Sequence, residues 1–73
     1  MDVEEGKTYE ICGYICGRTA RSKFITMGLN IGRKVKIVTV QPLHGPYVVS
    51  LNGNKLSVGR GLFEKLLLEE VND

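Results

Sequence analysis

The sequence is poor in the residues that build catalytic and metal centres. Its 73 residues include one histidine, His44, and two cysteines. A non-haem iron centre needs a converging set such as two histidines and a carboxylate, and no local cluster offers one. A nucleophilic enzyme needs a base and an orienting group, and His44 has no such partner motif. None of the nine glycines forms a G-x-x-x-x-G-K-[ST] string, so there is no P-loop. We expect no catalysis, no cofactor and no tight metal site.

Long hydrophobic runs and a cationic leader are also missing. No apolar run approaches the ~20 residues that a membrane-spanning helix requires. The first five residues, MDVEE, are acidic where a signal peptide would be basic. We therefore expect a cytoplasmic protein that does not insert into membranes by itself. A chain of this length predicts a single domain over 1–73, with a small core and no large active-site cavity.

The excess of positive charge is small, and the basic residues are unevenly distributed along the chain. The net charge is +2, and seven of the ten basic residues lie between Arg18 and Lys55. A nucleic-acid-binding module is therefore the alternative function, with a groove lined by Arg18, Arg21, Lys23, Arg33, Lys34 and Lys36. Single-strand binders usually add exposed aromatic side chains, and strand alternation directs only Tyr14 outward. The sequence argues against this alternative without excluding it.

The clearest local pattern is a β-hairpin over Tyr47–Val58. Asn52-Gly53 between two alternating runs predicts a type I′ turn. That turn sets Leu51 opposite Asn54 and, two steps further out, Val49 opposite Leu56. Continuing outward, Tyr47 opposes Val58, so apolar residues meet on one face without a register slip.

Two further strands precede the hairpin. Val35–Val40 is β-branched at five of six positions, and its alternation fits a long, bent strand shared by both halves of a small barrel. Thr8–Cys16 also alternates and predicts Tyr9, Ile11 and Ile15 in the core, with Gly13 at a bulge or bend. Cys12 and Cys16 would then lie about 13 Å apart, too far for a disulfide, so both are interpreted as reduced thiols. A bulge at Gly13 would favour the alternative, in which the two cysteines act as a pair in a metal site or a disulfide.

A short helix is predicted over Gly17–Met27. Ala20, Phe24 and Met27 share its inner face with Ile25 beside them, whereas Arg21 and Lys23 face outward. Gly28 follows at the left-handed position of a Schellman stop, in which the next residue, Leu29, packs back on Phe24.

The end of the chain is ambiguous from pattern alone. Leu62, Phe63, Leu66 and Leu67 have the spacing of an amphipathic helix, whereas Leu67, Glu69 and Val71 alternate as in a strand. Helix propensity favours the first interpretation. Glycines at positions 59 and 61 argue against an early helix start.

Taken in order, these motifs resemble the ferrous iron transport protein A (FeoA) family. The resemblance covers nearly the whole chain and departs from the family pattern at Phe24 and His44-Gly45. The residues that carry it are Gly6, Met27-Gly28-Leu29, Gly32, the Val35–Val40 strand, Pro42, Gly45-Pro46, Leu51-Asn52-Gly53 and Leu56-Ser57-Val58. It implies a mainly β fold, a five-stranded SH3-like barrel with one short helix after strand 1. It also implies a single helical turn over Leu62–Lys65 and a closing strand over Leu66–Val71, and an unclosed barrel would expose an apolar edge.

The resemblance also implies a function. FeoA-like proteins are small cytoplasmic accessory or regulatory proteins of ferrous iron uptake, thought to act on the GTPase-bearing cytoplasmic part of the ferrous iron permease. Similar barrels are appended to iron-dependent repressors, so a regulatory role stays open, as does weak self-association through a strand edge. For a protein partner, the predicted contact surface combines the helix with the proline-framed loop, through Arg21, Lys23, Met27, Leu43 and His44. The alternative, that these residues merely cap the barrel, stays open.

Overall fold

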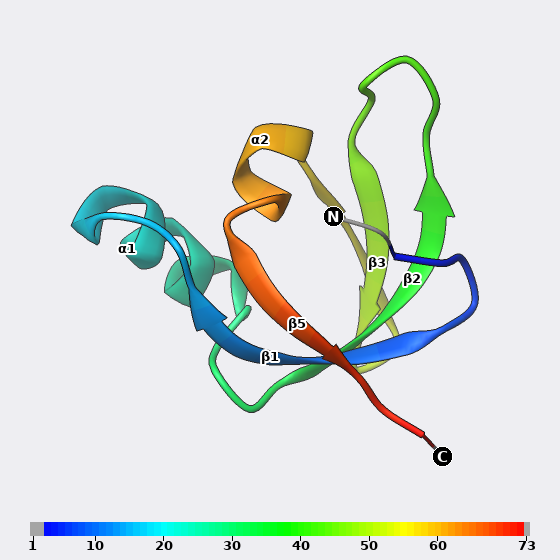
Figure 1. Cartoon of the computed structure of the whole chain (residues 1–73), viewed down its shortest axis with the longest axis horizontal. Coiled ribbons are helices and arrows are strands. Elements are labelled where there is room, and N and C mark those ends of the chain that lie inside the picture. Colours follow the sequence, from blue (N-terminus) through cyan, green and yellow to red (C-terminus); the bar gives the residue numbers. More distant parts are fainter. Residues whose placement is uncertain (1–2, 73) are drawn as a thin grey trace.

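A computed structural model describes residues 3–72 of the chain. Five strands and two short helices alternate along it (Figure 1). In chain order they are β1 (Thr8–Tyr14), α1 (Arg18–Met27), β2 (Lys34–Val40), β3 (Tyr47–Leu51), β4 (Asn54–Val58), α2 (Arg60–Phe63) and β5 (Leu66–Glu70). The predicted helix after the first strand and the helical turn before the last strand are both confirmed, although the turn begins two residues earlier than expected.

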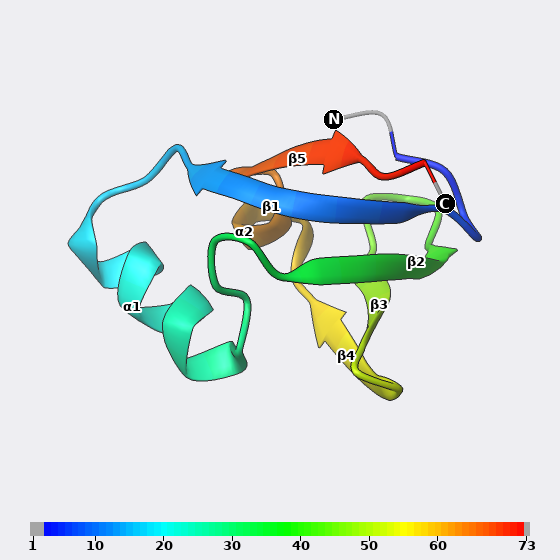
Figure 2. The ribbon, with the colours of Figure 1, turned by 90° about the horizontal axis from the view of Figure 1, so that it is seen from below.

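The five strands form one antiparallel sheet in the order β4-β3-β2-β1-β5. The sheet curves strongly, so that β3 and β4 face β1 and β5 across the interior (Figure 2). β2 is the strand that makes this possible, because it pairs with β1 near its start and with β3 along the rest of its length. The predicted mainly β, SH3-like architecture is confirmed, as is the choice of a strand over a helix for Leu66–Glu70.

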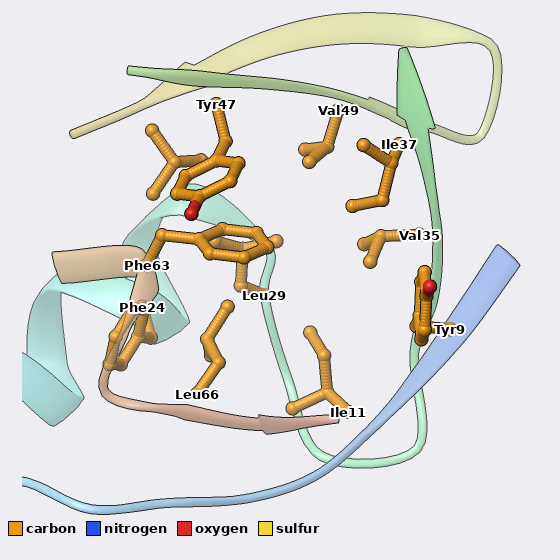
Figure 3. Packing of buried hydrophobic residues seen from close by; sticks show 11 residues of the cluster. Tyr9, Ile11, Phe24, Leu29, Val35, Ile37, Tyr47, Val49, Phe63 and Leu66 are labelled. Atoms are coloured by element: carbon orange, nitrogen blue, oxygen red, sulfur yellow. The ribbon is translucent and has the colours of Figure 1, made fainter. Parts of the chain in front are cut away.

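Eleven side chains fill the interior of the curved sheet (Figure 3). They come from all five strands, from both helices and from Leu29, the second residue after α1. The buried set is Tyr9, Ile11, Phe24, Leu29, Val35, Ile37, Tyr47, Val49, Val58, Phe63 and Leu66. Each helix contributes one buried phenylalanine, Phe24 from α1 and Phe63 from α2. The two helices therefore cover the open side of the curved sheet.

The β3–β4 hairpin has the predicted register. Leu51 pairs with Asn54, Val49 with Leu56 and Tyr47 with Val58. Asn52 and Gly53 have φ values of 53° and 82°. Positive φ at both central residues is what a type I′ turn demands, and this turn matches the right-handed twist of the strands.

A β-bulge in β1 reverses the predicted alternation. Ile11 pairs with Leu68 and Gly13 with Leu67, so Cys12 is the extra residue. Beyond the bulge the inward positions are inverted, and Ile15 is 64% exposed. Tyr14 instead stacks on Phe24 with ring centroids 5.0 Å apart, and its hydroxyl donates to the Leu29 carbonyl at 2.7 Å. The predictions that Ile15 faces the core and Tyr14 faces outward are therefore wrong.

The stop of α1 follows the predicted Schellman geometry. Gly28 has φ of 85°, its N–H donates to the Ile25 carbonyl, and the Leu29 N–H donates to the Phe24 carbonyl at 2.8 Å. Phe24 is the buried residue of the helix. Ile25, expected beside the inner face, is 53% exposed, because α1 meets the sheet along a narrow stripe centred on Phe24.

Replacing the glycine of this stop tests the cap. Gly28→Ala should lose on the order of 1 kcal/mol, because a residue with Cβ is forced into the left-handed region. The added Cβ would also lie 3.2 Å from Leu51 Cδ2. Chemical unfolding measures the loss. Gly61→Ala in α2 is the matched control, since its Cβ would meet nothing within 4 Å, and its stability should be unchanged or higher. Equal stability of Gly28→Ala and the parent would contradict the cap.

Candidate functional site

The five residues predicted to bind a partner lie on two separate surfaces. Arg21, Lys23 and Met27 belong to α1, whereas Leu43 and His44 belong to the loop between β2 and β3. The helix and this loop stand at opposite ends of the molecule in both ribbon views (Figures 1 and 2). The two groups therefore do not lie together, and partner binding stays a prediction for each of them. β2 separates them, because its seven extended residues run for roughly 20 Å between the segment that follows α1 and the loop.

The helix surface is divided further. Lys23 and Met27 lie together in an open hollow along one side of α1, lined also by Thr19, Ser22 and Thr26. Arg21 lies on another side, with its guanidinium carbon 5.8 Å from the centre of the Tyr14 ring. At this distance the cation interacts with the face of the ring, so Arg21 packs against the side chain that stacks on Phe24.

The β2–β3 loop ends in a tight turn that presents a leucine to solvent. The Gly45 N–H donates to the Pro42 carbonyl at 3.2 Å, and the two residues between them are Leu43 and His44. Both have positive φ, 59° and 61°, and Leu43 is 95% exposed. A left-handed conformation costs a residue with a Cβ about 1–2 kcal/mol. The fold therefore holds an apolar side chain in water on a strained turn, which is typical of a functional contact.

Arg60 is the first residue of α2, and its side chain lies near Tyr47, the first residue of β3 after this loop. Its guanidinium carbon is 5.1 Å from the centre of the buried Tyr47 ring. We call Leu43 and His44 the apical surface. Sequence reasoning did not single out Arg60, whose Nε atom is buried without a hydrogen-bond partner among the described residues.

Metal-ligating side chains are scattered over the described part of the chain. Within residues 3–72, no three histidine, cysteine, aspartate or glutamate side chains are grouped so as to hold a metal ion. His44 stands exposed on the loop, and Cys12 and Cys16 are free thiols. The Cys12 thiol donates instead to Glu69 Oε2 at 3.5 Å and to the Glu10 carbonyl at 3.6 Å.

Cys12 should be a slow nucleophile. Partial desolvation, the hydrogen bond to Glu69 and the negative charges of Glu69 and Glu10 all raise the pKa of this thiol. Because the thiolate is the reactive form, Glu69→Gln should lower the pKa of Cys12 and speed its alkylation by iodoacetamide between pH 8 and 9, by about two- to fivefold. Mass spectrometry of timed samples measures both cysteines. Cys16 is the internal control, and an unchanged rate at Cys12 would contradict the role of the carboxylate.

None of the helices in the described part of the chain is long and apolar enough to cross a bilayer.

Comparison with known proteins identifies the family. A model of the FeoA domain matches residues 1–70. The chain belongs to the FeoA family. A relative from Methanocaldococcus jannaschii, named "Putative Fe(2+) transport protein A", is 33% identical over 67 residues, which cover 92% of this chain and 79% of that protein. The predicted family membership is thus confirmed from the sequence side.

Solved structures agree with the fold. A crystal structure of the "Iron Uptake Regulatory Protein (FeoA)" superposes with a TM-score of 0.84 at 23% identity, covering 96% of this chain and 90% of that chain. The solution structure of a FeoA-like protein from Clostridium acetobutylicum gives a TM-score of 0.86 at 24% identity, with coverage of 99% and 84%. At these identities the likeness shows the shared fold alone.

Proposed function

We propose that this FeoA-family chain is a cytoplasmic accessory protein of ferrous iron uptake that acts by binding, not by catalysis. Its partner is the cytoplasmic GTPase-bearing domain of a ferrous iron permease. The iron-transport role is supported by the family match and by the name of the Methanocaldococcus jannaschii relative. The name of the FeoA crystal structure, an iron uptake regulatory protein, supports a regulatory mode of action.

The observation that carries the binding mode is the strained, exposed turn at Leu43. Two left-handed residues, with φ of 59° and 61°, hold a leucine that is 95% exposed. Burying such a side chain in a partner contributes roughly 1.5–3 kcal/mol. The geometry therefore favours a protein partner with an apolar recess for Leu43.

The aromatic side chains support a protein partner over nucleic acid. All five aromatic residues of the chain are buried or partly buried: Tyr9, Tyr14, Phe24, Tyr47 and Phe63. Stacking on exposed rings contributes much of the affinity of single-strand binders. Without exposed aromatic rings, nucleic-acid binding would depend on contacts between basic side chains and phosphates. Such contacts weaken steeply as the salt concentration rises.

A direct titration tests this function. Labelled protein is titrated with the soluble cytoplasmic domain of the permease from the same organism, in its GTP and GDP states, with generic RNA at physiological ionic strength as a control. We expect saturable binding to the domain and none to RNA. The proposal would be contradicted by two results together: no saturable binding in either nucleotide state, and unchanged iron uptake after deletion of the gene. Salt-dependent binding to RNA alone would favour the nucleic-acid module.

A further inference from the structure

We propose that β5 is the dimerisation edge of this protein, where a second copy of the chain adds its own β5 as an antiparallel strand. The two-fold axis passes between the two Leu67 residues, and Lys65 of each copy lies opposite Glu69 of the other. Both copies use the same strand, so the contact closes into a dimer. This surface is separate from the apical surface, and the proposal does not depend on the permease.

β5 has one unpaired edge. It follows β1 at the end of the sheet (Figure 2), and within residues 3–72 its ladder joins it to β1 alone. The Ile15 N–H donates to the Lys65 carbonyl, and the Val71 N–H donates to the Thr8 carbonyl. The odd-numbered residues of β5 therefore bond to β1, and the backbone groups of the even-numbered residues point to the other edge. Such an edge is a template for another strand.

The outer face beside this edge carries exposed apolar side chains. Leu67 is 43% exposed and lies over Gly13, because a Cβ added to that glycine would be 3.3 Å from Leu67 Cδ1. Ile15 is two residues beyond Gly13 on the same face of β1, and it is 64% exposed. Two large apolar side chains thus lie in water beside an unpaired edge, a combination that soluble proteins usually avoid.

The register of the dimer follows from the side chains of β5. When the even-numbered residues exchange hydrogen bonds so that Leu66 pairs with Leu68 of the second copy, Leu67 faces its own counterpart. Lys65 and Glu69 then face each other twice, once on each side of the axis. All three pairs are non-hydrogen-bonded pairs, in which cross-strand side chains approach most closely. A slip of two residues would set Leu67 opposite a charged residue and would lose both ion pairs, so charge complementarity favours one register.

The two charges are available for this contact. The ion pairs found within 4.0 Å in residues 3–72 all involve Lys7, and neither Lys65 nor Glu69 takes part. Both side chains are exposed. They are four residues apart on an extended strand, which separates them by about 13 Å, so they cannot pair within one chain. The Cys12 thiol donates to Glu69 Oε2, which leaves the other carboxylate oxygen free for the lysine of the second copy.

The opposite edge of the sheet lacks this complementarity. Lys55 is the single charged residue of β4, so two β4 strands could form no ion pair. Because only one edge suits a second copy, association should stop at a dimer. The paired strands are short, so we expect a weak dimer with a dissociation constant on the order of 0.1–1 mM.

Charge reversal tests the dimer by sedimentation equilibrium of the full chain, over a concentration series that spans this dissociation constant. Lys65→Glu and Glu69→Lys should each weaken the dimer by about tenfold or more, because each variant sets like charges opposite each other twice. An equimolar mixture of the two variants should associate again, since every facing pair is then of opposite sign. Lys55→Glu makes the same change of charge on β4 and should leave association within about twofold of the parent. A monomeric parent, or single reversals that associate like the parent, would overturn the proposal.

Disulfide trapping tests the register, in a background with both native cysteines changed to serine. Leu67→Cys places two thiols opposite each other at the axis, at a Cα separation that a disulfide accepts. With oxidised glutathione as the oxidant, its covalent dimer should form about tenfold faster than that of Glu69→Cys, because residue 69 faces Lys65 and not its own counterpart. Circular dichroism confirms that both variants fold. Equal trapping rates, or faster trapping of Glu69→Cys, would show that the register is wrong.

Discussion

Phe24→Ala should destabilise the protein by about 3–5 kcal/mol, the usual cost of emptying a buried phenylalanine site. Phe24 is 0% exposed, stacks on Tyr14 and accepts the Leu29 N–H of the helix stop through its carbonyl group. A chain of this size has a total stability of roughly 4–11 kcal/mol, so the loss would leave it marginally folded. Urea unfolding followed by circular dichroism measures the change.

The neighbouring residue provides the control for this prediction. Ile25→Ala also truncates a large hydrophobic side chain in the same turn of α1, but Ile25 is 53% exposed and its loss should cost less than about 1 kcal/mol. If the two variants lose equal stability, Phe24 is not the anchor of the helix. Amide hydrogen exchange adds a second test, because loss of the anchor should open α1 before it opens β2 and β3.

The parts of this fold that were predictable from the sequence depend on local rules. The Asn52-Gly53 turn fixes the hairpin register through backbone conformations that few other residue pairs adopt. Gly28 likewise ends α1 in a left-handed conformation that few other residues adopt, and this places Leu29 against Phe24. In each case the deciding interaction spans six residues or fewer, so the sequence pattern contains all of it.

The wrong predictions concern residues whose orientation depends on a strand that is distant in the sequence. Gly13 indicated an irregularity in β1, but the inversion of Tyr14 and Ile15 depends on how β5 pairs across the bulge. The ambiguous final segment was likewise settled by pairing with β1 and not by its own propensity. Local alternation cannot show which of two adjacent residues a partner strand leaves unpaired.

The candidate site was only partly predictable for a similar reason. Leu43 and His44 stood out in a proline-framed loop, and the structure shows the left-handed turn that makes them unusual. Their grouping with α1 failed, because the length and direction of β2 separate the two elements. The packing of Arg60 on the Tyr47 ring likewise depends on α2 and β3, which are apart in the sequence.

The double variant Leu43→Asn/His44→Gly should raise stability and lower function at once. Asparagine followed by glycine suits two consecutive left-handed residues, so relief of the present strain at 59° and 61° should add about 1–2 kcal/mol to the free energy of unfolding. The same change removes the apical leucine, so affinity for the permease domain should fall about tenfold to a hundredfold. Urea unfolding and the binding titration measure the two effects independently.

The single variants separate conformation from contact. His44→Gly relieves one left-handed residue and keeps Leu43, so it should be more stable than the parent and bind nearly as well. Leu43→Asn should account for most of the lost affinity. A double variant that binds like the parent would show that Leu43 contacts no partner, whereas a loss of stability would show that the turn is not strained in solution. A rise in stability together with a fall in affinity would mean that this loop is maintained for recognition at the expense of stability. Stability alone would favour asparagine and glycine at these positions.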